Sequence, residues 1–272
     1  MRRAIFLDVD GTIIDHTERL APSVVDAVRG ARANGHLVFL CTGRAPAEIS
    51  TRITEIGFDG AITAGGGYAE LRGDLIAEHA MPRDLLRSAV DFFESERIEY
   101  ILQSFGAVYP SVGLTERLRQ LIGDDLGDWG LTSSTVRPDL DSIPSIAKLT
   151  FFGEGPTTFA RVRDTLVPDL HVLTGTMPYL GEAGGEVAPP GVNKGVAIAE
   201  MLAAVGVSPD DAVAIGDSAN DIEMLTLVGV GIAMGNADGN VKAVADEVTT
   251  GVDDDGVWNA FVRHGLVVPE KP

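Results

Sequence analysis

Short apolar runs alternate with helically spaced apolar residues in the first third of the chain and again in the last third. Compact apolar runs at 4–9, 37–41 and 60–64 predict buried strands. Helices are predicted between these strands, from about 22 to 34 and from about 46 to 56. Strands that alternate with helices predict a parallel sheet covered on both faces. The fold class expected for these parts is α/β, with a Rossmann-like, doubly wound core.

The middle of the chain follows a different pattern. From about residue 83 a helical stripe is followed by strand-like runs at 99–104, 146–152, 171–174 and 179–182, with one helix at 157–166. Several strands beside few helices predict a separate, partly antiparallel α+β domain. Gly-rich 183–185 and Pro-rich 189–191 are expected to form the return linker. We therefore predict a core formed by residues 1–82 and 186–272, with an α+β domain inserted at 83–185.

The last third returns to the alternation of the first. A helix is expected from about 194 to 205, a strand at 212–215, a helix from about 220 to 227 and a strand at 229–233.

Composition and charge narrow the range of partners. The 272 residues are 45% hydrophobic, and 21 basic against 40 acidic residues give a formal charge of −19. Such a field repels nucleic acid and anionic membrane surfaces, so neither is expected as a partner. No apolar run approaches the roughly 18 residues of a membrane span. Asp8 and Asp10 interrupt the apolar N-terminal stretch before it could serve as a signal peptide, so a cytoplasmic location is expected.

Polar residues follow the first two predicted strands. Asp8 and Asp10 stand at the end of the first strand, where two unpaired carboxylates would be costly and where Mg²⁺ would find hard oxygen ligands. An ordinary Asp turn is the alternative. Thr42 and Gly43 follow the second strand, and they fit either a small anion cradle or a plain helix N-cap. In an open parallel sheet, ligands bind beyond such carboxyl ends.

The last third carries two further polar groups. Lys194 lies at the head of a predicted helix and fits either a phosphate-binding lysine or a solvated surface lysine. Asp217 and Asp221 follow a predicted strand with Asn220 between them, which fits either metal ligation or a capped helix start. Taken together, the four groups supply what metal-assisted phosphoryl transfer to a carboxylate nucleophile requires.

The order of these groups resembles the four motifs of the haloacid dehalogenase-like (HAD) hydrolase superfamily. The segments that carry the resemblance are Asp8-Val9-Asp10-Gly11-Thr12, Thr42-Gly43-Arg44, Lys194 and Gly216-Asp217-Ser218-Ala219-Asn220-Asp221. The insert between the second and third motifs resembles the type IIB (C2B) cap of the Cof-like phosphatases. The tail segment Gly229 to Ala237 also resembles that group.

The resemblance implies a role for each motif residue. Asp8 would attack phosphorus and form an aspartyl-phosphate, while Asp10 would act first as acid and then as base. Mg²⁺ would be held by the Asp8 carboxylate, the Asp10 carbonyl and Asp217, with Asp221 orienting its waters. The phosphoryl oxygens would be bound by Thr42, Gly43, Lys194, Asn220 and the backbone near Val9.

The function expected from the resemblance is a Mg²⁺-dependent phosphatase for small phosphate monoesters, such as sugar phosphates or related metabolites. The alternatives are a phosphomutase of the phosphomannomutase type and a non-catalytic sugar-phosphate-binding regulator. One departure concerns Gly65, in Ala64-Gly65-Gly66-Gly67, where this group commonly carries Asn-Gly. Recognition of the leaving group is therefore expected to differ here. His171, like the other histidines, is expected first to be a surface or internally hydrogen-bonded side chain. Lys148 and His171 of the inserted domain are, as the alternative, candidates to face the substrate.

Overall fold

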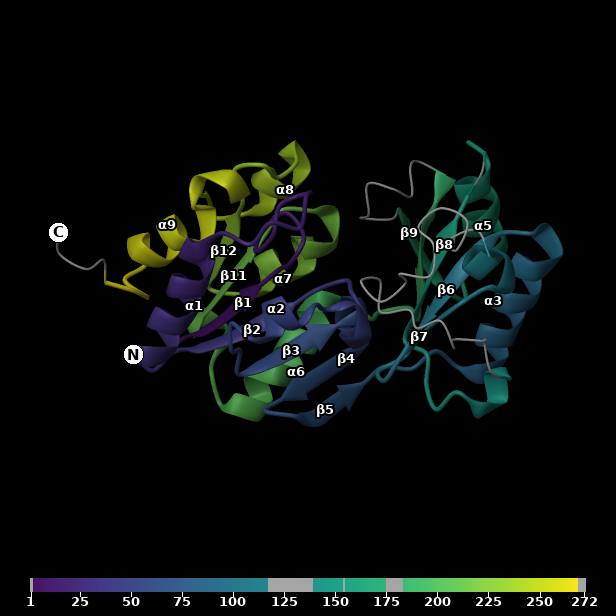
Figure 1. Ribbon diagram of the computed structural model, residues 1–272, viewed down its shortest axis with the longest axis horizontal. Helices are drawn as coiled ribbons and strands as arrows, with labels where there is room; N and C mark the ends of the chain where they lie inside the picture. The colour runs from purple at the N-terminus through teal and green to yellow at the C-terminus, as the bar shows by residue number, and fades with distance from the viewer. Residues whose placement is uncertain (1, 117–138, 154, 175–182, 269–272) are drawn as a thin grey trace. The chain divides into compact units, whose positions relative to one another are not determined.

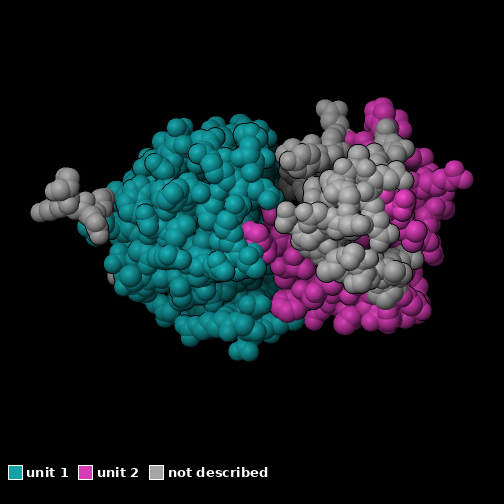
Figure 2. All heavy atoms as spheres, viewed as in Figure 1, with its two compact units in different colours: residues 1–43, 51–77, 193–272 teal, residues 44–50, 78–192 magenta. Residues whose placement is uncertain are grey.

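The computed structural model describes residues 2–116, 139–153, 155–174 and 183–268 (Figure 1). The chain forms two compact units, coloured separately in Figure 2. The first unit contains residues 1–43, 51–77 and 193–272, and the second contains residues 44–50 and 78–192. Each unit has its own sheet.

The sheet of the first unit has eight strands in the order β13-β12-β11-β1-β2-β3-β4-β5. Neighbours from β13 to β3 pair in parallel, and β4 pairs antiparallel with β3. The strands are β1 (Ala4–Leu7), β2 (Leu37–Cys41), β3 (Gly60–Thr63), β4 (Tyr68–Leu71), β5 (Asp74–Glu78), β11 (Ala212–Gly216), β12 (Val230–Ala233) and β13 (Glu247–Val248). The predicted parallel α/β core is confirmed.

Helices pack on both faces of this sheet. They are α1 (Pro22–Ala33), α2 (Thr51–Thr54), α6 (Lys194–Val205), α7 (Ile222–Leu227), α8 (Gly239–Val244) and α9 (Gly256–Arg263). Alternate strand residues such as Phe6 and Phe39, whose rings stack at 5.1 Å, share an apolar core with Ile198 of α6 and Met224 of α7. Along each strand, the residues that alternate with these point to the opposite face of the sheet. Helices α1 and α9 contact one another in the same unit.

Local sequence fixes the start and end of α6, the helix that carries Lys194. The side chain of Asn193 accepts a hydrogen bond from the backbone N–H of Val196 at 2.9 Å, which satisfies one of the unpaired donors at the helix start. Gly206 ends the helix in the left-handed conformation, with a φ of 66°. Lys194 is therefore held in the first turn of a well-capped helix.

The second unit contains an antiparallel sheet in the order β7-β6-β8-β10-β9. One face of it packs against α3 and α5 through an apolar core that includes Leu86, Phe93, Leu149, Phe151 and Val162. The elements are α3 (Arg83–Glu96), β6 (Glu99–Gln103), β7 (Val108–Pro110), β8 (Lys148–Phe152), α5 (Thr158–Leu166), β9 (His171–Thr174) and β10 (Gly185–Ala188). The predicted α+β insertion is confirmed.

Lys148, a candidate to face the substrate, is buried in the second unit beside other polar side chains. Its Nζ lies 2.9 Å from the Glu186 carboxylate. Gln103, paired with Lys148 in the sheet, donates to the Glu48 carboxylate at 2.7 Å. His171, the other candidate, is exposed on β9.

The structure corrects the sequence-based prediction in several places. The helix expected at 46–56 is broken into a 3-10 turn at Pro46–Glu48 and the short α2, because Ile49 between them is extended and Glu48 is bonded to Gln103. The hairpin of β4 and β5 was not predicted. Gly185, the last residue of the segment expected to begin the return linker, is the first residue of β10, which pairs with both β8 and β9. The strand expected at 179–182 lies outside the described residues.

The second unit is formed by two segments of the chain. Its boundaries fall at 77/78 and 192/193, and it also takes in residues 44–50. In the described parts of the chain, no helix combines the length and the apolar character needed to cross a membrane.

Replacing Phe93 with Ala should lower the free energy of unfolding of the second unit by about 3–5 kcal/mol. The Phe93 ring is fully buried, and its centroid lies 5.7 Å from the rings of Tyr100 and of Phe151. Urea unfolding monitored by circular dichroism measures the loss. Val112→Ala, at a side chain that is 77% exposed, serves as the control and should change stability by less than about 0.5 kcal/mol. Equal effects of the two substitutions would contradict this account of the core.

Candidate active site

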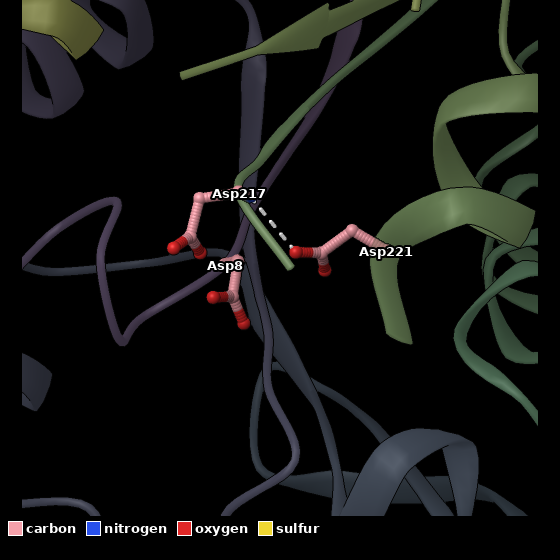
Figure 3. Close-up of side chains that lie close together, drawn as sticks. All are labelled: Asp8, Asp217 and Asp221. Carbon is pink, nitrogen blue, oxygen red and sulfur yellow. Dashed lines mark hydrogen bonds between the residues drawn. The ribbon is translucent and has the colours of Figure 1, made fainter. Parts of the chain in front are cut away.

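Two neighbouring parallel strands bring the first carboxylates of the site together. Leu7 at the end of β1 is in register with Ile215 of β11, and the Asp8 N–H donates to the Ile215 carbonyl at 3.0 Å. Asp8 and Asp217 therefore leave the sheet at the same edge, as Figure 3 shows. This is the carboxyl edge, where ligands bind in open α/β sheets.

A buried lysine joins two of the carboxylates. Lys194 Nζ donates to Asp8 Oδ1 and to Asp221 Oδ1, with both distances 2.6 Å. The Lys194 side chain is 1% exposed and that of Asp221 is 0% exposed. The structure therefore excludes the solvated surface lysine that the sequence left open. Charge-assisted hydrogen bonds of this length, out of contact with water, are among the strong ones in proteins.

Both carboxylate oxygens of Asp221 are engaged within the protein. Oδ1 accepts from Lys194, and Oδ2 accepts from the backbone N–H groups of Asp217 and Ser218 at 3.0 Å each. The bond from Asp217 is the dashed line in Figure 3. Asp221 thus fixes the loop after β11 and the lysine together.

Asp217 has an oxygen for which no donor is found. Oδ1 is buried, and no described residue gives it a hydrogen bond. Carboxylate oxygens of Asp8, Asp217 and Asp221 lie within 4.8 Å of one another, and the Lys194 ammonium contacts two of them, Asp8 and Asp221. A buried carboxylate oxygen without a donor is costly, and a divalent cation would satisfy it with the hard oxygen ligands that such ions prefer. The residues present therefore fit a divalent metal site.

Burial and crowding shift the proton affinities of this cluster. Burial, and then the neighbouring Asp221 charge, raise the pKa of Asp8 well above its usual value. The same two causes raise the pKa of Asp217 to about 7. Burial alone would lower the pKa of Lys194, but the adjacent Asp221 and Asp8 charges outweigh it and raise that pKa. Lys194 therefore stays charged, and the metal-free carboxylates resist full ionisation.

The turn after β1 places the remaining acidic residue of the first motif. Asp10 is exposed, two residues beyond the buried Asp8. Gly11 adopts a φ of 76°, and a Cβ atom at this position would stand 2.1 Å from Asp217 Oδ2. Only glycine allows the turn to approach the carboxylate this closely. The structure brings Asp8, Asp217 and Asp221 together, and it leaves Asp10 at the surface of the same turn.

The second motif leaves the same edge of the sheet, because β2 pairs with β1. Thr42 is buried, and its backbone N–H donates to the Ile62 carbonyl at 2.8 Å. Its carbonyl accepts from Gly65 at 3.0 Å. Gly65 has a φ of 66°, and a Cβ there would meet nothing within 4 Å. Gly66 has no such space, since its Cβ would lie 2.3 Å from the Asn193 carbonyl oxygen beside Lys194.

Two further side chains complete the edge. Asn220 is partly buried, and its Oδ1 accepts from the Ser218 hydroxyl at 2.8 Å. Asn236, to which the sequence analysis gave no role, donates from Nδ2 to the Gly11 carbonyl at 2.9 Å and contacts Asp217 Oδ2 at 3.4 Å. A signal was present in the sequence, because Asn236 follows β12, whose carboxyl end lies at this same edge.

Comparison with known proteins assigns this arrangement to a family. The model of the haloacid dehalogenase-like hydrolase family matches residues 5–261. The chain belongs to the haloacid dehalogenase-like hydrolases. The resemblance found in the motifs is thereby confirmed over nearly the whole length of this HAD protein.

The similarity to known relatives extends over nearly the whole HAD chain. A phosphoglycolate phosphatase of Methanothermobacter thermautotrophicus is 29% identical over 263 residues, which cover 96% of this chain and 98% of that protein. Pyridoxal phosphate phosphatase YbhA of Escherichia coli is 27% identical over 275 residues, which cover 96% and 98% of the two chains. The solved structure of BT4131, a sugar phosphatase of HAD subclass IIB, matches the fold with a TM-score of 0.79 at 24% identity, over 97% of this chain and 100% of that one.

These comparisons place the chain in the haloacid dehalogenase-like hydrolase family, and its fold matches that of a subclass IIB structure. The family and its phosphatase relatives identify the chain as a phosphoric monoester hydrolase. The family and the cluster of Asp8, Asp217 and Asp221 together indicate a divalent metal site.

The pKa of Asp217 leads to a prediction for protein treated with EDTA. An aspartate with the ordinary pKa of 3.8 in the unfolded chain and a pKa of about 7 when folded binds its proton more tightly in the folded state. Its contribution to stability is therefore complete below the unfolded pKa and is lost as the pH rises through the folded pKa. Asp217→Asn removes this loss. The difference in unfolding free energy between the Asp217→Asn variant and the unsubstituted protein should therefore grow, in favour of the variant, from about pH 4 to about pH 7.

Urea unfolding of both proteins in EDTA, at several pH values across that range, measures the difference. A gain that is constant across the range, or that shrinks as the pH rises, would show that Asp217 is not held in the buried carboxylate cluster described above.

Proposed function

We propose that this phosphatase hydrolyses small phosphate monoesters, with Mg²⁺ as its divalent cation, through an aspartyl-phosphate formed on Asp8. The observation that carries the proposal is the buried Lys194 ammonium, bonded at once to Asp8 and Asp221. It holds the Asp8 carboxylate at the edge of the sheet and supplies positive charge where a dianionic ester must approach.

Asp8 and Asp10 divide the chemistry between them. An Asp8 oxygen attacks phosphorus as the ester P–O bond breaks, and Asp10 gives its proton to the leaving alcohol. A water then attacks the phosphorus of the aspartyl-phosphate, and its proton passes to Asp10 as the Asp8–phosphorus bond breaks. Inorganic phosphate leaves, and both carboxyl groups return to their starting states. The exposed position of Asp10 fits its contact with a substrate that enters from solvent.

The transferring phosphoryl group is bound by groups at the carboxyl edge. Lys194 and Asn220 supply side-chain donors, and the hydroxyl and backbone of the Thr42-Gly43 segment supply others from the neighbouring strand. The backbone near Val9 completes the set. The net charge of −19 makes this local concentration of donors necessary for any anionic substrate.

The Asp8 carboxylate, the Asp10 carbonyl and Asp217 would hold Mg²⁺, and Asp221 would orient it indirectly. The hydrogen bonds support this division, since both Asp221 oxygens already accept hydrogen bonds while Asp217 Oδ1 accepts none from the described residues. When bound, Mg²⁺ would offset the charge that the carboxylates and the phosphoryl group share.

The substrate we propose is a sugar phosphate or a related metabolite. The solved relative of subclass IIB is described as a sugar phosphatase, and the sequence relatives act on phosphoglycolate and pyridoxal phosphate. The substrates of all three relatives are small phosphate esters with polar leaving groups. The set of donors at the carboxyl edge recognises the phosphoryl group that such esters share.

Purified protein should release inorganic phosphate from members of a panel of phosphate esters in the presence of Mg²⁺, and EDTA should abolish the release. Asp8→Asn should remove all measurable turnover, because the amide cannot form the acyl phosphate. Asp10→Asn should lower kcat by about 10²–10⁴-fold, the usual contribution of a general acid–base residue. Circular dichroism confirms that both variants are folded.

Turnover by Asp8→Asn would refute the mechanism. The product distinguishes the phosphomutase alternative: a mutase returns the phosphoryl group to the sugar and depends on a bisphosphate activator. Isomerised sugar phosphate as the main product, without free phosphate, would therefore replace the proposed hydrolysis.

A further inference from the structure

The side chain of Asn236 connects three parts of the first unit. Its Oδ1 accepts from the Val252 N–H at 2.9 Å, and its Nδ2 donates to the Gly11 carbonyl at 2.9 Å. The same Nδ2 lies 3.4 Å from Asp217 Oδ2. One amide thus contacts the turn after β1, the loop after β11 and the loop before α9.

The backbone that carries Asn236 is held on both sides. The Met234 N–H donates to the Gly216 carbonyl at 2.9 Å, and the Gly235 N–H donates to the Thr250 carbonyl at 3.0 Å. Lys242 Nζ donates to the Gly235 carbonyl at 2.7 Å. The position of the Asn236 side chain is therefore set by the protein around it, although the residue itself is exposed.

The orientation of the amide is set by its partners. Val252 offers an N–H, while Gly11 and Asp217 offer only oxygens. A flipped amide would place its own oxygen against those two acceptors and its NH₂ against a donor. The Nδ2 group must therefore face Gly11 and Asp217.

Asp217 depends on this contact. Among the described residues, Asn236 is the one whose side chain donates toward the Asp217 carboxylate. Asp217 Oδ2 lies so close to Gly11 that a Cβ there would come within 2.1 Å of it, and the buried Oδ1 accepts no hydrogen bond within the described part of the chain. A donor on Oδ2 fixes the rotation of the carboxylate and leaves Oδ1 for another partner.

We propose that Asn236 is a positioning residue for the divalent cation: it holds the Asp217 carboxylate so that Oδ1 faces the metal, and it fixes the turn of Asp10 and Gly11 beside it. A neutral amide suits this task, because it donates a hydrogen bond without adding a positive charge that would compete with the cation. The inference rests on the proposed function only in so far as the cation binds at Asp8 and Asp217.

The test compares two asparagines that anchor the same loop. Asn259 donates to the Thr250 hydroxyl at 2.8 Å and to the Asp254 carbonyl at 3.0 Å. Among the described residues, its side chain makes no hydrogen bond with Asp8, Asp217 or Asp221. Titration calorimetry of EDTA-stripped protein, after the chelator is removed, measures the Kd for Mg²⁺ without any substrate. Asn236→Ala should raise this Kd about 10-fold or more, the usual effect of losing a group that orients a metal ligand. Asn259→Ala should leave it within about twofold.

Activity provides a second readout. The Mg²⁺ concentration for half-maximal phosphate release should rise for Asn236→Ala by the same factor as the Kd, and the rate at saturating Mg²⁺ should largely recover. Thermal unfolding without metal shows how much each substitution loosens the loop, and this loss should be similar for Asn236→Ala and Asn259→Ala. Asn236→Ser, which removes the amide donor but keeps a small polar side chain, serves if the alanine variant does not fold.

An Asn236 variant that binds Mg²⁺ as tightly as the unsubstituted protein would overturn the proposal, and so would equal weakening by Asn259→Ala. An unsubstituted protein that binds no Mg²⁺ would overturn it as well. If that protein binds Mg²⁺ but releases no phosphate from any ester, the proposed function fails while the comparison of Kd values still decides the role of Asn236.

Discussion

The buried contact of Lys194 with Asp8 and Asp221 is the interaction on which the site depends. Three carboxylates within 4.8 Å of one another repel, and burial strengthens that repulsion. The ammonium group offsets part of this charge, and it joins α6 to the ends of β1 and β11. Breaking such a buried pair on one side typically costs about 3–5 kcal/mol, because the charges left behind have no partner. The same contact therefore serves the stability of the first unit and the approach of an anionic substrate.

The remaining negative charge gives the cluster its affinity for a cation. Asp217 Oδ1 has no hydrogen-bond donor among the described residues, and the pKa of Asp217 rises to about 7 through burial and the nearby Asp221. This unbalanced negative charge favours the binding of a divalent cation by the carboxylate oxygens. Stability of the metal-free protein and affinity for the metal are thus opposed at Asp217.

Close approach of backbone segments makes this geometry possible. Gly11 lies against the Asp217 carboxylate, and Gly66 lies against the Asn193 carbonyl, each at a distance that excludes a Cβ atom. Asn236 then holds Gly11 and Asp217 together from the end of β12. The edge of the sheet is consequently a set of short loops fixed to one another, which is the preorganisation that phosphoryl transfer requires.

Local sequence patterns are enough to predict the parallel core and the inserted α+β region, because buried strands and capped helices leave periodic patterns. They also locate the four motifs, because Asp8, Thr42, Lys194 and Asp217 each follow such a strand or start such a helix. They do not determine which alternative each polar group follows. The local sequence around a lysine at a helix start is the same whether the lysine is solvated or buried. Only the pairing of β1 with β11 places Lys194 between two carboxylates. The break at Ile49, the pairing of β10 and the role of Asn236 also depend on partners distant in sequence, which local patterns do not record.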